Sequence, residues 1–416
     1  MSGCDCGSHH SGPALKPIEE ALDFLLARVH AVSETEQVAT EDALGRVLAE
    51  PVASLVTVPP WNNSAMDGYA VNTADLQVDS TRLPISQRIP AGATGEPLQR
   101  GTAARIFTGA PVPSGADAVV IQEVCEQDGD DVVVNDAPKA GANIRLAGED
   151  IKEGEEILSA GTRLGPQHLG LAAAVGVADL TVFRRLKVAV FSSGDELVMP
   201  GSELGPGQIY NSNQFTLGGM LQALGCEVIQ LGIIEDTFEA TCDALARAAE
   251  QADLVVASGG VSVGEEDYVK PAVEKLGSLD LWKIAIRPGK PLAFGHIGET
   301  PFIGTPGNPV SLFVTFCVFA RPYILRSQGV MEGAIPTPMT AKAGFDWNKP
   351  DKRREYARAR MVLNESGEAV VTLYPSRSSG VLSSVAWANG LAIIPEREML
   401  KKGDPVQFLS FHELMS

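Results

Sequence analysis

The residues most suited to chemistry are carboxylates that directly follow apolar runs in the middle of the chain. Glu196 follows KVAVF, Asp236 follows CEVIQLGII, and Asp267 closes GGVSVGEEDY, which follows DLVVAS. Hard divalent cations prefer oxygen ligands and commonly bridge a phosphate while keeping some waters. Asp195, beside Glu196, is a fourth candidate oxygen ligand. These four carboxylates therefore predict a metal site next to a phosphate-bearing ligand.

Positive charge and glycine-rich backbone accompany these carboxylates. The loop RPGKP (287–291) carries cations, and GTPGNPVS (304–311) opens into a helix whose N–H groups favour an anion. Glycines let a backbone approach a ligand closely. Any one of these loops alone could be an ordinary turn. The three loops with carboxylates and the two Gly/Pro-rich loops together make five at one sheet edge, and this grouping favours a phosphate and metal site. The candidate substrate-binding residues in this region are Gly259, Gly260, Ser262, Lys283, Arg287 and Lys290.

Three turns near the N-terminus carry a further polar set. VPPWNNSAMDGYAV holds Asp67, ARIFTGAPVP holds Thr108, and GANIRLAGEDI holds Arg145 and Asp150. An Asx-type turn is the alternative interpretation of the Asp67 segment, and each of the other two could likewise be only a turn.

Near the C-terminus, Arg354, Tyr356, Arg358 and Arg360 share one parity along an expected strand and so face one way. A solvated strand face and an oxyanion contact are both compatible with this pattern. Serines in the following turn, including Ser379, could add neutral donors.

An α/β domain must position the central residues. Near-continuous apolar runs are typical of strands buried on both faces of a parallel or mixed sheet, and their alternation with helical patterns indicates a doubly wound fold, in which ligands bind at the carboxyl ends of strands. The expected strands are 187–191, 226–234, 253–258, 281–286 and 291–295, and the expected helices are 213–224, 238–250, 268–276 and 309–325.

The segments on either side of the α/β domain predict three further domains, namely two small β domains and a mixed helical N-terminal domain. The expected fold is therefore that of a multidomain α/β protein. Helices are expected at 18–29, at 40–50 and at 167–175, with 152–185 packing back on the first two. The predicted divisions are a disordered tail at 1–16, a mixed helical domain at 17–52 with 152–185, a β domain at 53–151, the α/β domain at 186–330 and a C-terminal β-barrel at 331–416.

The composition and charge of the chain argue against a nucleic-acid-binding protein, a membrane protein and a secreted protein. Lys and Arg total 33 against 52 Asp and Glu, so the formal net charge is -19 and no global basic field attracts nucleic acid or anionic lipid. The apolar run 309–320 is shorter than a bilayer crossing requires, and the N-terminus lacks the pattern of a secretory signal. We therefore expect a cytoplasmic protein without a membrane span.

Six cysteines are spread along the chain, which in a cytoplasmic protein favours free thiols over disulfides. Cys4, Cys6, His9 and His10 cluster in the N-terminal tail. Their soft ligands suit zinc or copper, but the flanking Gly and Ser favour a mobile tail that binds metal only incidentally.

Taken together in order, the motifs SAMDGYAV, RIFTGAPVP, NIRLAGEDI, SSGDEL, SGGVSVGEEDY, WKIAIRPGKPLAFG and GTPGNPVS resemble those of the molybdopterin molybdenumtransferase (MoeA) family, which also includes the E domain of gephyrin. The resemblance runs from about residue 17 to the C-terminus. It implies an elongated four-domain homodimer, in which the β domain of one subunit faces the α/β domain of the other.

The resemblance also implies a reaction: adenylylated molybdopterin and molybdate give molybdenum cofactor, with magnesium required and AMP released. It places Glu196, Asp236 and Asp267 near the pterin, phosphates and magnesium, and Arg358 and Ser379 near molybdate. One departure is visible, because the residue before PGKP is often Lys in the family and here is Arg287. The family's activity and ligand-contact positions also match Asp67, Thr108, Arg145, Asp150, Lys283, Pro306 and Pro309.

Two other functions compete with this one. The α/β domain alone could adenylylate molybdopterin, or the chain could act as a non-enzymatic molybdopterin-binding scaffold. Partners implied by the main hypothesis are a second copy of the chain, a molybdopterin adenylyltransferase and acceptor molybdoenzymes. ATP-dependent adenylylation by the purified chain would favour the first alternative, and AMP release only on addition of molybdate would favour the main hypothesis.

Overall fold

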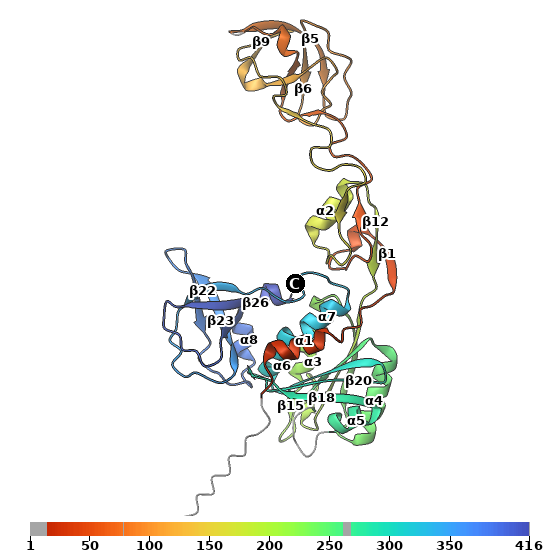
Figure 1. The fold of residues 1–416 in the computed structure, drawn as a ribbon, viewed down its shortest axis with the longest axis vertical. Coiled ribbons are helices and arrows are strands. Elements are labelled where there is room, and N and C mark those ends of the chain that lie inside the picture. Colours follow the sequence, from red (N-terminus) through yellow and green to blue (C-terminus); the bar gives the residue numbers. More distant parts are fainter. Residues whose placement is uncertain (1–14, 78, 261–267, 416) are drawn as a thin grey trace, which may run out of the picture.

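Three six-stranded sheets organise the chain in a computed structural model that describes residues 15–77, 79–260 and 268–415. Figure 1 shows an elongated molecule with a β domain at one end and the α/β domain at the other. A small body containing α2 (Pro166–Ala174) and β12 (Asp179–Phe183) lies between them, and a C-terminal barrel lies beside the α/β domain. The multidomain α/β fold class predicted from the sequence is confirmed.

The α/β sheet has the strand order β16-β13-β17-β21-β20-β18. The first four strands run parallel to their neighbours, whereas β20 is antiparallel to both β21 and β18. Their bounds are β13 Lys187–Ser193, β16 Glu227–Ile234, β17 Leu254–Ser258, β18 Gly277–Lys283, β20 Pro291–Ile297 and β21 Thr300–Thr305.

The strand directions bring five loops to one edge. The ends of β13, β16, β17, β18 and β21 and the start of β20 all lie at the carboxyl edge of the sheet, because Lys283 pairs with Pro291 and the parallel strands end side by side. The common edge expected from the sequence is therefore present. Strand β21 was not among the expected strands, and 281–286 is not one strand, since β18 ends at Lys283 and β19 (Ile286–Arg287) pairs with another sheet.

Helices cover both faces of this sheet. One core cluster joins α3 (Ser212–Ala223), α6 (Pro309–Thr315) and α7 (Arg321–Ser327), and a second joins α4 (Phe238–Gln251) and α5 (Val269–Leu276). The four expected helices are thereby confirmed. Between α6 and α7, Phe316–Ala320 forms a π-helical stretch.

The helix α1 (Ile18–Leu26) also belongs to this domain. Ile18, Ala21 and Leu25 are buried in the same cluster as Tyr323 of α7. The expected packing of residues 152–185 against this helix is therefore wrong, because the apolar face of α1 is covered by the α/β core.

One helix in the described part of the chain, Pro309–Ser327, has the length and hydropathy of a membrane span, and 89% of its most apolar window is buried inside the protein. Such burial is typical of a core helix.

The small body between the two ends has its own core, in which Leu48 and Val52 pack with Leu164, Ala172 and Val182. The helix expected at 40–50 is wrong. Only Thr40–Asp42 forms one 3₁₀ turn, because Gly45 (φ 73°) and the following residues bond to the distant segment 162–164. Its paired strands are β1 (Thr35–Ala39) with β12, and β2 (Val52–Ala53) with β11 (Glu156–Leu158).

The β domain is a six-stranded sheet in the order β7-β4-β6-β5-β9-β8. Its strands are β4 Gly68–Val71, β5 Thr81–Ile89, β6 Ala103–Ile106, β7 Ala118–Ile121, β8 Cys125–Asp128 and β9 Asp131–Val134. A separate short pair, β3 (Asn63–Ser64) and β10 (Ile144–Arg145), lies at the start of β4.

The C-terminal domain closes into a barrel, because β25 pairs with both β26 and β23. Its strands are β22 Met339–Ala343, β23 Arg354–Leu363, β24 Ala369–Leu373, β25 Gly390–Ile394 and β26 Pro405–Ser410, with short helices α8 Ser383–Trp387 and α9 Phe411–Met415. The strand β19 from the α/β region extends this sheet by pairing in parallel with β23.

The four described cysteines Cys125, Cys226, Cys242 and Cys317 are free thiols, in agreement with the expectation. The cysteine and histidine cluster of the N-terminal tail lies outside the described residues.

A bidentate ion pair joins the small middle body to the α/β sheet. Arg184 Nη1 and Nη2 donate to Asp253 at 2.6 and 2.8 Å, and the Lys187 N–H donates to the same carboxylate. Although burial alone raises the pKa of Asp253, these hydrogen bonds lower it overall. The ionised carboxylate therefore stabilises the folded state.

Asp253→Asn should lower the free energy of unfolding by about 1–3 kcal/mol at pH 7. Because the folded pKa lies below the unfolded value of about 3.9, this contribution is present above pH 4 and is lost as the pH falls through the folded pKa. Urea titrations at pH 7 and pH 3 would measure it. A gap between wild type and variant that is as large at pH 3 as at pH 7 would contradict the ion-pair explanation.

Candidate active site

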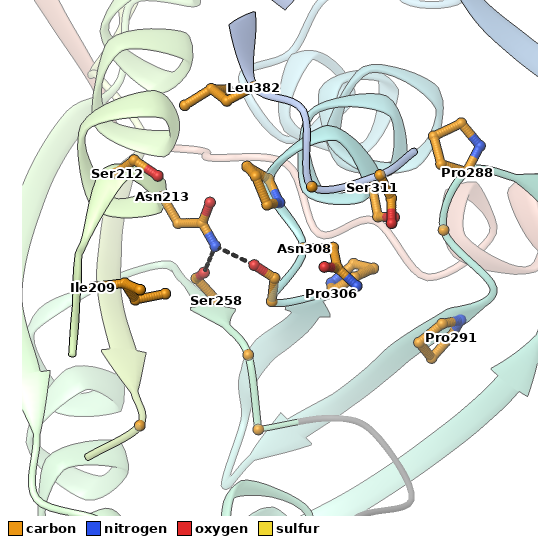
Figure 2. Close-up of a pocket in the computed structure, with 18 of the residues that line it drawn as sticks. Ile209, Ser212, Asn213, Ser258, Pro288, Pro291, Pro306, Asn308, Ser311 and Leu382 are labelled. Carbon is orange, nitrogen blue, oxygen red and sulfur yellow. Dashed lines mark hydrogen bonds between the residues drawn. The ribbon is translucent and has the colours of Figure 1, made fainter. Parts of the chain in front are cut away.

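A cavity of about 1300 Å³ opens between the carboxyl edge of the α/β sheet and a loop of the barrel. Figure 2 shows its walls, with Ser258 and Pro306 beside the sheet edge and Leu382 on the opposite side. The cavity brings together the predicted residues Glu196, Asp236, Gly259, Gly260, Arg287, Lys290, Pro306, Pro309 and Ser379.

The acidic wall is formed by the loops after β13 and β16. Ser193 Oγ donates to Asp236 Oδ1 at 3.1 Å, which fixes that half-buried carboxylate, and Glu196 is exposed at the cavity rim. Among the described residues, no group of three or more His, Cys, Asp or Glu side chains is placed to hold a metal. Asp267 and Ser262, expected at the same edge, lie outside the described residues.

Amide and hydroxyl groups line the adjoining wall and were not singled out from the sequence. Asn213 Nδ2 donates to Ser258 Oγ (2.9 Å) and to the Gly307 carbonyl (2.7 Å), as Figure 2 shows. The Asn213 Oδ1 atom is buried and has no hydrogen-bond partner among the described groups. The NSN triplet between an apolar pair and a helix start was the available signal in the sequence.

The loop 287–291 forms the basic wall and rests on α6. Gly289 has φ 96°, and a Cβ there would lie 2.6 Å from Thr315 Oγ1. Glycine is therefore required by both conformation and space. The loop is thereby held against the helix, with Arg287 and Lys290 at the cavity.

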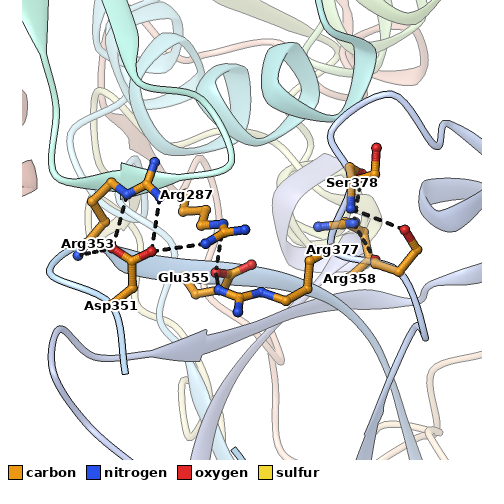
Figure 3. A network of polar contacts seen from close by, with 8 residues as sticks. Arg287, Asp351, Arg353, Glu355, Arg358, Arg377 and Ser378 are labelled. Carbon is orange, nitrogen blue, oxygen red and sulfur yellow. Dashed lines mark hydrogen bonds and ion pairs between the residues drawn. The ribbon is translucent and has the colours of Figure 1, made fainter. Parts of the chain in front are cut away.

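Further cations come from the barrel and form a network with Arg287 (Figure 3). Arg353 Nη2 and Arg287 Nη1 both lie 3.0 Å from Asp351 Oδ2. The Glu355 carboxylate pairs with Arg287 and with Arg377. Hydrogen bonds from Arg353, and then from Arg287, hold the pKa of Asp351 well below its usual range. Arg353 and Arg377 line the cavity, and the sequence analysis did not assign them to it.

The structure places Arg358 behind the cavity instead of at its surface. This side chain is 2% exposed, its Nη2 donates to the carbonyls of Ser376 and Ser378, and its Nε donates to Ser384 Oγ. Burial lowers the pKa of Arg358. Arg358 therefore holds the serine loop from behind, and this loop, which includes Ser379, lines the cavity. The solvated strand face considered from the sequence is wrong for Arg358 and for Tyr356, which is also buried.

Lys283 lies at the end of β18, on the same sheet edge, but is not among the residues that line the cavity. Its carbonyl accepts a hydrogen bond from the Lys16 N–H (2.9 Å), so the segment before α1 covers this position.

The polar turns of the β domain form a second cluster. Asp67 Oδ1 accepts from both the backbone N–H and the hydroxyl of Thr108, each at 2.8 Å, and these bonds lower the pKa of Asp67. Arg145 is exposed in β10, and β10 pairs with β3, the short strand that precedes Asp67 in the sequence. Asp150 is exposed, and its N–H bonds to Val58.

Gly68 positions Asp67 by allowing two strands to approach closely. A Cβ at Gly68 would lie 1.9 Å from the carbonyl oxygen of Val120 in β7. Backbone cannot give way as a flexible side chain can, so Gly68→Ala should separate β4 from β7 and cost about 3 kcal/mol or more. Thermal unfolding of the full chain would measure the loss, and a variant that unfolds at the wild-type temperature would contradict the strand contact. Gly170→Ala is the control, because Gly170 in α2 has no positive φ and nothing lies within 4 Å of a Cβ built there.

The two clusters lie far apart within one chain. Figure 1 shows the β domain beyond the small middle body, at the opposite end from the α/β domain. Asp67 directly precedes β4 of the β domain, whereas the cavity lies at the edge of the α/β sheet. One chain therefore does not bring Asp67, Thr108, Arg145 or Asp150 to the cavity.

Three known domain families match consecutive parts of the chain. Residues 16–176 match the MoeA N-terminal region (domain I and II), residues 189–326 match a probable molybdopterin binding domain, and residues 340–411 match the MoeA C-terminal region (domain IV).

The similarity extends along the whole chain. A protein of Haemophilus influenzae named molybdopterin molybdenumtransferase is 38% identical over 96% of this chain and 99% of its own length, and one of Nostoc with the same name is 36% identical over 92% and 90%. A crystal structure of the molybdopterin biosynthesis MoeA protein of Pyrococcus horikoshii superposes with a TM-score of 0.82 at 30% identity, covering 95% of this chain and 100% of the other. Sequence motifs, domain order and fold therefore agree that the chain belongs to the MoeA family.

Proposed function

We propose that the protein is a molybdopterin molybdenumtransferase that inserts molybdenum from molybdate into adenylylated molybdopterin and releases AMP. The observation that carries this proposal is the cavity, which combines carboxylates on one wall with Arg287, Lys290, Arg353 and Arg377 on the other. The names of the family members cited above support the same assignment.

The charges of the cavity suit two anionic substrates. The protein has a formal net charge of -19, so an anion needs a local basic surface to enter. Four cations on one wall can bind phosphate and an oxyanion, and cations placed in advance also stabilise the charge that develops when a phosphoanhydride is cleaved. The neighbouring backbone at Gly259 and Gly260 leaves room for close approach of a phosphate.

Magnesium is part of the proposal, and the donor set fits it. Magnesium in nucleotide sites is usually held by one or two carboxylates, with waters and substrate phosphates completing its coordination. Asp236 and Glu196 supply such oxygens at the cavity, with Asp236 fixed by Ser193. When bound, the ion would neutralise charge on the phosphates of the substrate. The two carboxylates would hold it on the wall that faces the basic loop.

A homodimer is also proposed, since it would supply the Asp67 cluster to the cavity of the other subunit. Large apolar side chains are exposed around both clusters, which is typical of interaction surfaces. Next to Asp67 and Arg145 in the sequence they are Met66 and Leu146, and at the cavity they are Ile209 and Tyr210. A second copy that covered both surfaces would bring the two polar clusters together.

The proposal places the enzyme in the cytoplasm, between a molybdopterin adenylyltransferase that supplies its substrate and acceptor molybdoenzymes that receive its product. The acidic surface and the buried position of helix Pro309–Ser327 are consistent with a protein that needs neither nucleic acid nor membrane.

The test is to incubate the purified protein with adenylylated molybdopterin, magnesium and molybdate, omitting each in turn, and to follow AMP. AMP release that requires all three supports the proposal. Release without molybdate, or none with the complete mixture, would contradict it. ATP-dependent formation of adenylylated molybdopterin would instead favour the adenylyltransferase alternative.

A further inference from the structure

Three arginines of the cavity are backed by two carboxylates that do not line it. Arg287, Arg353 and Arg377 are lining residues, whereas Asp351 and Glu355 are not. Figure 3 shows the five side chains as a continuous chain of ion pairs in which positive and negative charges alternate. The positive groups thus face the cavity, and the negative groups lie behind them.

Glu355 is distinctive among these ion pairs because it contacts cations from two domains. It is the register partner of Arg287 in the parallel pair β19–β23, and its Oε2 atom lies 3.5 Å from Arg287 Nε and 2.5 Å from Arg377 Nη2. Arg287 comes from the loop at the α/β sheet edge, and Arg377 comes from the serine loop of the barrel. One carboxylate therefore links the α/β domain to the barrel behind the basic wall.

The surroundings of Glu355 and Arg377 restrict both groups. Glu355 is 2% exposed, and the Arg377 guanidinium carbon lies 4.3 Å from the centre of the Trp347 ring. Glu355 Oε1 and Arg377 Nε are buried and have no hydrogen-bond partner among the described groups. Such incomplete pairing is costly in a buried site, and it leaves the arginine donors less than fully used by the protein itself.

We propose that Glu355 is a positioning residue: its shared contact with Arg287 holds Arg377 in place, and Arg377 and Arg353 contact a tetrahedral oxyanion. Guanidinium groups have five N–H donors in a fixed plane that matches such oxygens. Molybdate and the phosphate of the nucleotide share this chemistry. The inference rests on the proposed function for the identity of the oxyanion, but its binding test is independent of turnover.

The Glu355→Gln variant separates positioning from simple electrostatics. Removing a negative charge near an anion site should tighten anion binding if only the net charge matters. If positioning dominates, binding should weaken, because a neutral amide oxygen holds each guanidinium more weakly than a carboxylate does, and the amide NH2 group adds donors beside cations that cannot accept them. The two explanations thus predict opposite signs.

The experiment measures equilibrium binding of molybdate and of AMP, each alone, to the full-length protein by calorimetry, without the pterin substrate. Glu355→Gln and Arg377→Gln should each weaken binding of at least one of these anions about tenfold. The double variant should lose less than the product of the single losses, since both changes affect the same arginine. Glu396→Gln is the matched control, because Glu396 pairs with Arg354 on the same sheet but does not line the cavity.

Each outcome is informative. Weaker binding of molybdate alone assigns the arginines to molybdate, and weaker binding of AMP alone assigns them to the nucleotide phosphate. Unchanged or tighter binding of both anions in Glu355→Gln, or single losses that multiply in the double variant, would overturn the inference. If Glu355→Gln does not fold, Arg377→Gln and Arg377→Lys carry the test, and wild-type affinity for both anions in both variants would overturn it.

The proposed function and this inference can fail independently of each other. A wild-type protein that binds an oxyanion in a Glu355-dependent manner but releases no AMP from the complete mixture would support this inference and contradict the proposed function. Molybdate-dependent AMP release by the wild type, together with molybdate and AMP affinities that do not change in the Glu355 and Arg377 variants, would support the proposed function and contradict this inference.

Discussion

Asp67→Ala is expected to reduce molybdate-dependent AMP release at least about hundredfold while the protein stays folded. The carboxylate is only half-buried and is oriented by two hydrogen bonds from Thr108, so its removal should cost little packing. The same two hydrogen bonds lower the pKa of Asp67 and so favour its ionised form, which a group that contacts a metal would need. Steady-state AMP release and thermal unfolding, measured on the same sample, would check both parts of the expectation.

Asp75→Ala is the matched control for Asp67→Ala. Asp75 follows the other end of β4, and it too accepts one backbone and one side-chain hydrogen bond, from Gly101 and Arg100. The two variants should therefore have similar stability, and only Asp67→Ala should lose activity. Full activity in a folded Asp67→Ala protein would remove Asp67 from the proposed site.

If the proposed dimer shares its sites between subunits, a dimer of one Asp67→Ala chain and one Asp236→Ala chain should recover roughly half of the wild-type activity, although neither variant should be active alone. The β domain, which contains Asp67, and the α/β domain, whose cavity contains Asp236, lie at opposite ends of the elongated molecule. If each site combines the β domain of one subunit with the cavity of the other, the heterodimer has one intact site and one site with both changes. Co-expression with two different affinity tags and purification on both would give this species for an AMP-release assay.

The reciprocal pairing distinguishes shared sites from sites within one chain. A chain with both substitutions, paired with a wild-type chain, should be inactive if the sites are shared, because each site then contains one change. It should keep about half of the activity if each site lies within one chain. An active reciprocal pair together with an inactive first heterodimer would rule out the shared site.

The central sheet and its loops could be predicted from the sequence because their signals are local. Strands buried on both faces read as apolar runs, and their carboxyl ends share one edge, so Glu196, Asp236 and Gly259 could be grouped before any fold was known. Helices α3 to α5 carried a clear apolar periodicity or a capping residue, such as Asn211 before α3 and Thr237 before α4.

The errors occur where contacts between distant segments decide the structure. Residues 43–48 have a helical pattern, yet their backbone groups bond to residues 162–164. The parity of Arg358 was visible in the sequence, but its burial was not, because that depends on α8 and on the loop at Ser376 packing over the same strand face. The roles of Arg353 and Arg377 depend on Asp351 and Glu355, whose positions follow from barrel closure.

The path of the chain around β19 has a mechanical consequence. After β18 the backbone leaves the α/β sheet, contributes Ile286–Arg287 to the barrel sheet, and returns through the loop 288–290 to β20. A swing of the barrel would therefore pull directly on the segment that carries Arg287 and Lys290. Opening of the cleft and displacement of its cations are thus coupled, so a release of product that widens this gap would also withdraw the groups that hold it.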